Sequence, residues 1–371
     1  MGDRYFFFAG GGTGGHIYPA VAVAKRLAEI DPTANIRFFC SSRSIDEQIL
    51  GKTGFEFTVL PARGLTRKPK EIINFFRCFV RSYKTARRAI RGLDHVVVIG
   101  VGGFVSAPVC LAAYRCKVPI ALLNVDIVPG RANRLIARWA GEIFVQFKDT
   151  KEYFAGRKGH VNIVGCPLRS GFGNPRAARA IEQLGLDANK KILLITGASS
   201  GSENINNAVC LLLEKLNAFA DDWQIVHLTG MNNFDEVAYA YGRAKIRHKV
   251  LDYFDDMPDL LAAADLVIGR SGAVSVAEYA AATVPSICMP YPYHKDRHQY
   301  LNAGKLVEVG AAVIVDDVRD EKDRAEWLWE ELEKLMKDEN ARQVMAEGCR
   351  MIANPGADLS IAETLLTMAD A

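Results

Sequence analysis

The sequence predicts an α/β protein with two doubly wound domains, each built on a parallel sheet with helices on both faces. Short apolar segments rich in β-branched or aromatic residues alternate with helix-length segments, the pattern typical of such sheets. The alternation ends and then restarts near residue 191. The 371 residues also exceed the size at which one hydrophobic core usually stops growing, so two domains are expected.

The expected strands form two series. The first series comprises Phe6 to Ala9, Asn35 to Cys40, Phe57 to Leu60, His95 to Ile99, Ile120 to Leu123 and Ile143 to Gln146. The second comprises Lys191 to Thr196, Gln224 to Leu228, Lys249 to Leu251, Leu266 to Gly269, Ser286 to Met289 and Ala312 to Val315. Glycine and proline cluster between residues 162 and 175. We therefore expect an N-terminal domain at residues 1–164, a second domain at 165–340, and C-terminal helices at 341–371 that pack toward the N-terminal domain.

Composition narrows the function classes. The formal net charge of +3 is too small to indicate a nucleic-acid partner. No apolar run reaches the roughly 18 to 20 residues that span a bilayer, and the first residues do not resemble a leader peptide, so we expect a cytoplasmic protein. The eight cysteines lack the spacing of a zinc site, so we assign no metal.

A glycine-rich loop, Gly10 to Gly15, follows the first strand and precedes a helix. Its spacing satisfies the dinucleotide fingerprint, but the next strand ends in Ser41-Ser42-Arg43, without the acid that holds a ribose. Arg43 would suit a 2′-phosphate, so an NADP-dependent oxidoreductase remains an alternative. His16 follows the loop, where an imidazole is placed to take a proton from a hydroxyl nucleophile. The alternative is a residue that only caps the start of the helix.

Two segments of the second domain also follow strands. After Leu266 to Gly269, Gly272 permits close backbone approach, the next amides suit a pyrophosphate, and Glu278 can accept from both hydroxyls of a ribose. Otherwise Glu278 is a surface carboxylate on a helix. The segment 290–303 carries dense polar side chains that suit sugar hydroxyls, or it is a solvated loop.

Four motifs, taken together and in order, resemble the MurG family of bacterial N-acetylglucosaminyltransferases. They are Gly11-Gly12-Thr13-Gly14-Gly15-His16 with Pro19, Gly100-Val101-Gly102-Gly103-Phe104-Val105-Ser106, Arg270-Ser271-Gly272-Ala273 through Glu278, and His294-Lys295-Asp296-Arg297-His298-Gln299-Tyr300-Leu301-Asn302-Ala303. The likeness extends from Phe6 to about Gly310.

The resemblance implies a GT-B fold and inverting transfer of N-acetylglucosamine from UDP-N-acetylglucosamine to undecaprenyl-pyrophosphoryl-N-acetylmuramyl pentapeptide (lipid I). The product would be lipid II, a precursor in peptidoglycan synthesis, and no tightly bound cofactor or metal is implied. The implied site residues are Thr13, Gly14, Gly15 and His16 at the transfer centre, Arg169 and Ser199 near the diphosphate, Phe254 near uracil, Ala273, Val274, Ser275, Val276, Ala277 and Glu278 on phosphate and ribose, and His298 and Gln299 on the sugar.

The chain departs from the family pattern at two places. The family's His-Glu-Gln-Asn reads Leu123-Asn124-Val125-Asp126 here, so Asp126 is the carboxylate that we expect to accept from a sugar hydroxyl. The family's Gly-Gly-Ser-Gln reads Gly197-Ala198-Ser199-Ser200. The first departure leaves open another GT-B glycosyltransferase with a different lipid acceptor. A UDP-sugar epimerase, which shares the architecture, is a further alternative.

Residues 63–91 contain ten Lys and Arg residues and one acid, Glu71. Apolar residues interleave with these cations at roughly helical spacing, which is typical of an amphipathic helix at an anionic membrane surface. The family resemblance makes this a docking segment for the cytoplasmic face of the plasma membrane, beside a lipid-linked acceptor. The alternatives are a helix that packs on the core with a solvated basic face, and an RNA-binding surface.

Overall fold

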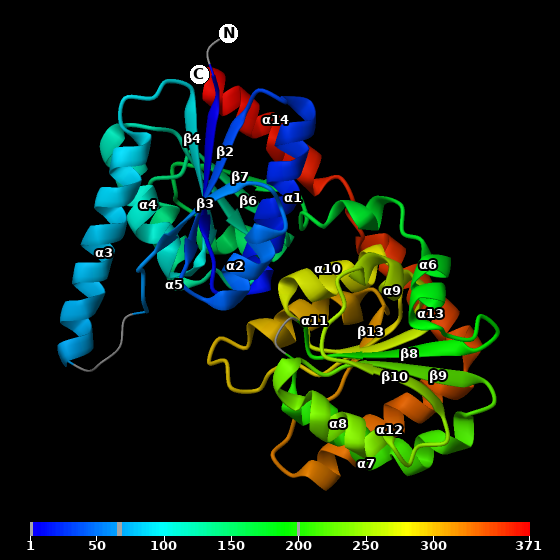
Figure 1. Ribbon diagram of the computed structural model, residues 1–371. Helices are drawn as coiled ribbons and strands as arrows, with labels where there is room; N and C mark the ends of the chain where they lie inside the picture. Colours follow the sequence, from blue (N-terminus) through cyan, green and yellow to red (C-terminus); the bar gives the residue numbers. More distant parts are fainter. Residues whose placement is uncertain (1–2, 65–68, 199–200) are drawn as a thin grey trace. The chain divides into compact units, whose positions relative to one another are not determined.

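The computed structural model describes residues 3–64, 69–198 and 201–371 (Figure 1). The chain divides into two compact units, Met1–Arg169 with Pro355–Ala371, and Ser170–Asn354. The division after Arg169 lies within the glycine- and proline-rich region at which we expected a boundary. The segment 341–371 does not stay together, because the helix Glu339–Ile352 belongs to the second unit and the helix Ala357–Asp370 to the first.

Among the described residues, the first unit holds a parallel sheet of order β3-β2-β1-β4-β5-β6-β7. Its strands are β1 (Tyr5–Gly10), β2 (Asn35–Ser41), β3 (Glu56–Leu60), β4 (Val96–Gly102), β5 (Ile120–Asn124), β6 (Glu142–Val145) and β7 (His160–Ile163). The central strands are buried along their whole length, as their uninterrupted apolar runs predict. The edge strand β7 was not predicted, because its residues are largely exposed and lack that apolar run.

Helices cover both faces of this sheet. They are α1 (Gly14–Ile30), α2 (Ser44–Gly51), α3 (Pro69–Ile90), α4 (Gly103–Cys116), α5 (Arg131–Ile136) and α14 (Ala357–Asp370). Figure 1 shows α1 beside α14, and α3 beside α4 on the other face. Arg4, just before β1, donates to Asp370 of α14 at 2.8 Å and to Asp31 after α1 at 2.8 Å. Arg4 thus links α14 to the end of α1, and the buried Ile361, Ala362 and Leu365 of α14 provide its apolar contact with the first unit.

In the second unit, the part of the chain that the structure describes forms a parallel sheet of order β10-β9-β8-β11-β12-β13. The strands are β8 (Lys191–Thr196), β9 (Trp223–Leu228), β10 (Arg247–Leu251), β11 (Leu266–Gly269), β12 (Ser286–Cys288) and β13 (Ala312–Ile314). The helices are α6 (Ala177–Leu184), α7 (Glu203–Leu216), α8 (Phe234–Tyr241), α9 (Met257–Ala263), α10 (Ala273–Ala281), α11 (His298–Glu308), α12 (Glu321–Lys337) and α13 (Glu339–Ile352).

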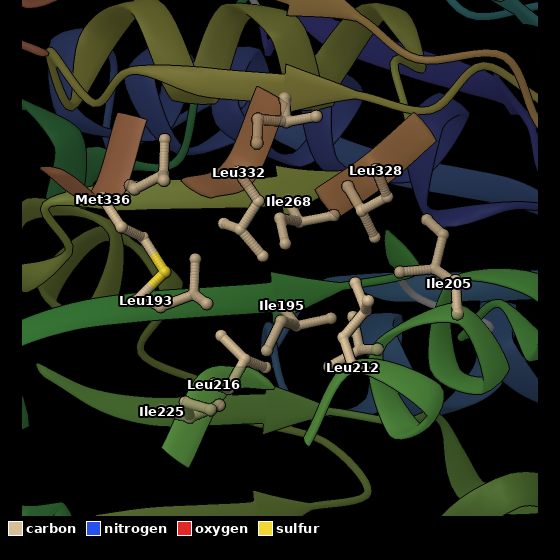
Figure 2. Close-up of a cluster of buried hydrophobic side chains, with 14 of the residues drawn as sticks. Leu193, Ile195, Ile205, Leu212, Leu216, Ile225, Ile268, Leu328, Leu332 and Met336 are labelled. Carbon is tan, nitrogen blue, oxygen red and sulfur yellow. The ribbon is translucent and has the colours of Figure 1, made fainter. Parts of the chain in front are cut away.

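The core of the second unit lies between the sheet and the helices α7 and α12. Figure 2 shows Leu193 and Ile195 of β8 beside Leu212 of α7 and Leu328 and Leu332 of α12. These side chains are at most 2% exposed, so the apolar faces of both helices are buried against the strands. The predicted α/β fold with two doubly wound sheets is confirmed.

Both sheets reverse their strand order at one place. In the first unit this point lies between β1 and β4, and in the second between β8 and β11. Ligands of open parallel sheets bind beyond the carboxyl ends of the strands at such points. The loops after these four strands are therefore where each unit is expected to bind its substrate.

Candidate active site

The loop between β1 and α1 contains the first motif. Gly11 has φ +151° and Gly12 φ +96°, conformations that favour glycine. A Cβ built on Gly103, the first residue of α4 directly after β4, would lie 2.5 Å from the Gly11 carbonyl oxygen. Only glycine at position 103 permits this approach. The first two predicted motifs are thus in direct contact at the point where the strand order reverses.

Two charged side chains hold the peptide groups of Gly12. The carboxylate of Asp46 accepts from the Gly12 N–H, with both oxygens 2.9 Å from the nitrogen, and Arg43 Nη1 donates to the Gly12 carbonyl at 2.6 Å. Asp46 is fully buried in α2 and also accepts from the amide and hydroxyl of Ser41. A carboxylate bound to this amide opposes a phosphate at the same place. The geometry therefore argues against the dinucleotide alternative.

The predicted residues from Thr13 to His16 form the start of α1. Thr13 is exposed at the N-cap position, and its Oγ1 lies 3.1 Å from His16 Nδ1. The imidazole of His16 packs on Gly102, where an added Cβ would lie 2.8 Å from Cδ2 and Nε2. The structure thus brings the candidate base into contact with both glycine motifs. Of the two glycines between Thr13 and His16, Gly14 is buried and Gly15 is half-buried.

The departure at the end of β5 has a structural explanation. Asn124 is buried, its Nδ2 donates to the Asp126 carbonyl at 2.7 Å, and its Oδ1 accepts from Asn133 of α5 at 2.8 Å. The side chain of Asn124 therefore stabilises the connection between β5 and α5. Asp126 is only half-buried, in the connection that follows β5, the strand next to β4 in the sheet. Arg169 places its guanidinium 4.6 Å from the ring centroid of Tyr18 in α1.

In the second unit, α10 begins directly after β11 and the connection Arg270–Gly272. Gly272 is extended at the N-cap position, and the helix starts at Ala273. The predicted residues Ala273, Val274, Ser275, Val276, Ala277 and Glu278 make up the first two turns of this helix. The first-turn amides of a helix have no acceptor within it and carry a partial positive charge, so this end of α10 suits an anion. Glu278 is 9% exposed.

Arg270 is a buried cation beneath these loops. Its Nη2 donates to Ser202 Oγ at 2.7 Å and its Nη1 to the Met289 carbonyl at 2.8 Å. Nη2 also lies 2.7 Å from Asp317 Oδ2, an ion pair without the alignment of a directed hydrogen bond. Asp317 pairs in addition with Arg324 at 2.8 Å. Two buried cations and one carboxylate leave this cluster with a formal charge of +1.

His298 and Gln299 begin α11, after the polar segment that the sequence indicated. Gln299 Oε1 accepts from the Tyr291 amide at 2.9 Å, so that side chain closes the segment onto the helix. His298 Nδ1 lies 2.8 Å from Asp296 Oδ1, and its ring stacks on His294 at 4.3 Å. Burial raises the pKa of Asp296, but the hydrogen bond and positive charge of His298 outweigh it and the pKa is lowered overall.

Two further predicted residues belong to the second unit. Phe254 is 7% exposed, in the connection from β10 to α9. Ser199 lies outside the described residues. Sequence reasoning missed Asp46, Ser202, Asp317 and Arg324, since nothing in the local pattern separates a buried Asp or Arg from a surface one.

Across the described ranges, no helix has the length and apolar character needed to cross a membrane. Nor do the His, Cys, Asp and Glu side chains of these ranges form a group of three or more that could hold a metal ion.

Two parallel-sheet units with glycine-rich loops at the points of strand reversal define the fold class as GT-B, and the family match that follows identifies a glycosyltransferase. Residues 6–145 match the glycosyltransferase family 28 N-terminal domain, and residues 192–358 match the C-terminal domain of that family. The crystal structure of Acinetobacter baumannii MurG superposes with a TM-score of 0.73 at 22% identity, covering 98% of this chain and 99% of that one. UDP-GlcNAc 2-epimerase from Neisseria meningitidis has the same fold, with a TM-score of 0.69 at 14% identity and coverage of 98% and 100%.

Sequence relatives identify the family. A UDP-N-acetylglucosamine–N-acetylmuramyl-(pentapeptide) pyrophosphoryl-undecaprenol N-acetylglucosamine transferase from Caldicellulosiruptor saccharolyticus is 35% identical, covering 97% of this chain and 96% of the relative. The transferase of the same name from Halothermothrix orenii is 34% identical, with coverage of 94% and 95%. The chain belongs to this family, the MurG family.

Proposed function

We propose that the protein transfers N-acetylglucosamine from UDP-N-acetylglucosamine to lipid I and so forms lipid II in peptidoglycan synthesis. The observation that carries this proposal is the full-length relationship to transferases of that activity, at 35% identity over 97% of the chain. The site geometry is consistent with it, since each unit has a glycine-rich loop where its strand order reverses.

The second unit binds the donor. The N-terminus of α10, from Ala273 to Ala277, meets the phosphates, and Glu278 accepts from the ribose hydroxyls. The family resemblance assigns Phe254 to uracil, Ser199 and Arg169 to the diphosphate, and His298 and Gln299 to the sugar. Of these residues, Arg169 is the last residue of the first unit. Charge on the departing UDP is met by the helix N-terminus and by the buried cluster of Arg270, so that no tightly bound cofactor takes part.

The first unit supplies the base. The acceptor hydroxyl attacks the anomeric carbon and transfers its proton to His16 while the bond from that carbon to the diphosphate oxygen breaks and UDP leaves. Thr13 holds the imidazole through Nδ1, and Gly14 and Gly15 keep the start of α1 free of bulky side chains. Asp126, half-exposed at the end of β5, accepts from a hydroxyl of the acceptor sugar.

Helix α3 docks on the anionic cytoplasmic surface of the membrane. Its residues Ser82, Ala86 and Ile90 are buried, whereas Ile73, Phe76 and Val80 are 46–59% exposed among exposed arginines. An apolar stripe on the solvent side of a basic helix suits a lipid interface. This exposed apolar stripe disfavours the alternative in which α3 packs on the core and presents only a solvated basic face.

Membrane docking is tested by sedimenting the full chain with vesicles of phosphatidylglycerol and with vesicles of phosphatidylcholine. We expect salt-sensitive binding to the anionic vesicles that Phe76→Ser weakens. Tyr239→Ser, which removes an 80% exposed aromatic side chain from the second unit, is the matched control. Equal binding of both variants and the unaltered chain would exclude α3 as the docking segment.

The reaction is tested with radiolabelled UDP-N-acetylglucosamine and either lipid I or simpler polyprenyl glycolipids. Transfer to lipid I supports the proposal, whereas transfer to another lipid alone identifies a different acceptor, as the Asn124 and Asp126 departure permits. Conversion of the donor without acceptor would identify an epimerase. His16→Ala should reduce turnover to a low residual rate while UDP still raises the melting temperature, because the donor binds the other unit.

A further inference from the structure

We propose that Asp46 and Arg43 are positioning residues that fix His16 through the peptide groups of Gly12. The inference rests on the proposed function, in which His16 accepts the proton of the acceptor hydroxyl. Neither residue belongs to the glycine motif, and both come from the connection that follows β2 and from the start of α2.

The two side chains hold Gly12 from opposite ends. Asp46, fully buried, binds the amide of Gly12 and is itself held by two hydrogen bonds from Ser41. Arg43, which is exposed, binds the Gly12 carbonyl at 2.6 Å. Both peptide groups next to the Gly12 Cα are therefore fixed by groups outside the loop.

The fixed peptide leads directly to the candidate base. Thr13 follows Gly12, its carbonyl accepts from the His16 amide at 3.1 Å, and its hydroxyl contacts His16 Nδ1. A displacement of Gly12 is thus passed on to the imidazole over one turn of helix.

The glycine-rich loop before α1 needs side chains from outside it to fix its conformation, because its own residues restrict the backbone very little. Glycines allow the positive φ values of Gly11 and Gly12 but leave the chain many other conformations. The nitrogen of a general base that accepts the proton must be held in place to well within 1 Å. A misplacement of about 1 Å can lower the rate about a hundredfold. Two ionic side chains on one half-buried glycine supply this restraint before substrate binds.

The test is a double-mutant cycle on full-length enzyme with lipid I and saturating donor. Arg43→Met keeps the aliphatic stem and removes the bond to Gly12, so we expect kcat to fall about ten- to a hundredfold with an unchanged donor KM. In the His16→Ala background the same substitution should change the residual rate less than about twofold, because the base is already absent. Arg43→Lys, which can still reach the carbonyl, should restore part of kcat.

Controls separate positioning from folding. Arg37→Met removes another arginine of the first unit, one that pairs with Glu56 on the exposed edge of the sheet, and should leave kcat unchanged. Asp46→Asn should lower kcat in the same way at a temperature where its unfolding curve shows folded protein. An Arg43→Met enzyme with full kcat, or one equally impaired with and without His16, would overturn the inference. Absence of transfer by the unaltered chain would instead overturn the proposed function.

Discussion

Replacing Asp317 by Asn should destabilise the second unit more than any other single change of charge near the donor loops. The carboxylate side chain has no exposed surface and pairs with Arg270 at 2.7 Å and Arg324 at 2.8 Å, and it accepts from Asn204 at 2.8 Å. The substitution keeps the shape of the side chain and leaves two buried cations without their anion.

The expected loss follows from these contacts. Breaking a buried ion pair by removing one partner typically costs about 3–5 kcal/mol. Arg270 keeps its bond to the Met289 carbonyl and Arg324 its bonds to the Val318 carbonyl, so the lower end, about 3 kcal/mol, is expected. For a unit of this size that is a fall of roughly 6–12 °C in melting temperature.

The assay is thermal unfolding of the full chain with and without UDP. Asp316→Asn is the matched control, since it makes the same charge change on the exposed neighbouring residue, whose carboxylate only accepts from Tyr300. Donor KM should rise for Asp317→Asn as well, because Arg270 also holds Ser202 at the loop after β8. A melting temperature lowered by less than about 2 °C, or by no more than in the control, would refute this account of the cluster.

Three further predictions concern the backbone and pH. Burial lowers the pKa of His227 from 6.5 to about 3, so below pH 6.5 the unfolded chain binds a proton that the folded chain does not. Stability should therefore fall by up to about 1.4 kcal/mol per pH unit as the pH is lowered from 6.5 toward 3. Denaturant unfolding at pH 7 and pH 5 should show a smaller difference for His227→Gln. Ala198 has φ +61°, so Ala198→Gly should raise stability by about 0.5–1 kcal/mol, and a lowered melting temperature would contradict this. Gly103→Ala should abolish transfer by displacing the Gly11 carbonyl. Gly92→Ala, with φ +84° and nothing within 4 Å of the added carbon, should cost about 1 kcal/mol and leave kcat intact.

The sequence predicts the strands well where both faces are buried. The predicted strands Lys191–Thr196 and Leu266–Gly269 begin and end at the observed residues. Each is an apolar run followed by a glycine or a polar turn, and this change in composition marks where the strand ends. β7 was missed because an exposed edge strand carries no such signal. The order of strands, and with it the contact between the loops of Gly11 and Gly103, follows from pairing that no local pattern reveals.

The side chains that support the site could not be predicted for the same reason. Asp46 reaches Gly12 only because β1 and β2 are paired in parallel, with Ala9 opposite Phe39, which brings the residues after both strands together. In the sequence, Asp46 is one acid in a polar helix start. Its function as an acceptor for a loop amide depends on tertiary structure, as does that of Asp317 between two arginines from different elements.

The glycine-containing loops of the two units differ in the charge beneath them. At the first loop the buried carboxylate of Asp46 binds the Gly12 amide and the exposed guanidinium of Arg43 binds the Gly12 carbonyl, so the two formal charges cancel. Beneath the second unit's loops lies the buried cluster of Arg270, Asp317 and Arg324, with a formal charge of +1. A dianionic nucleotide is favoured more by the positively charged cluster of the second unit than by the formally neutral pair at the first loop. In the proposed function, this difference in charge supports binding of the UDP-sugar by the second unit and leaves the loop beside His16 for an uncharged sugar hydroxyl.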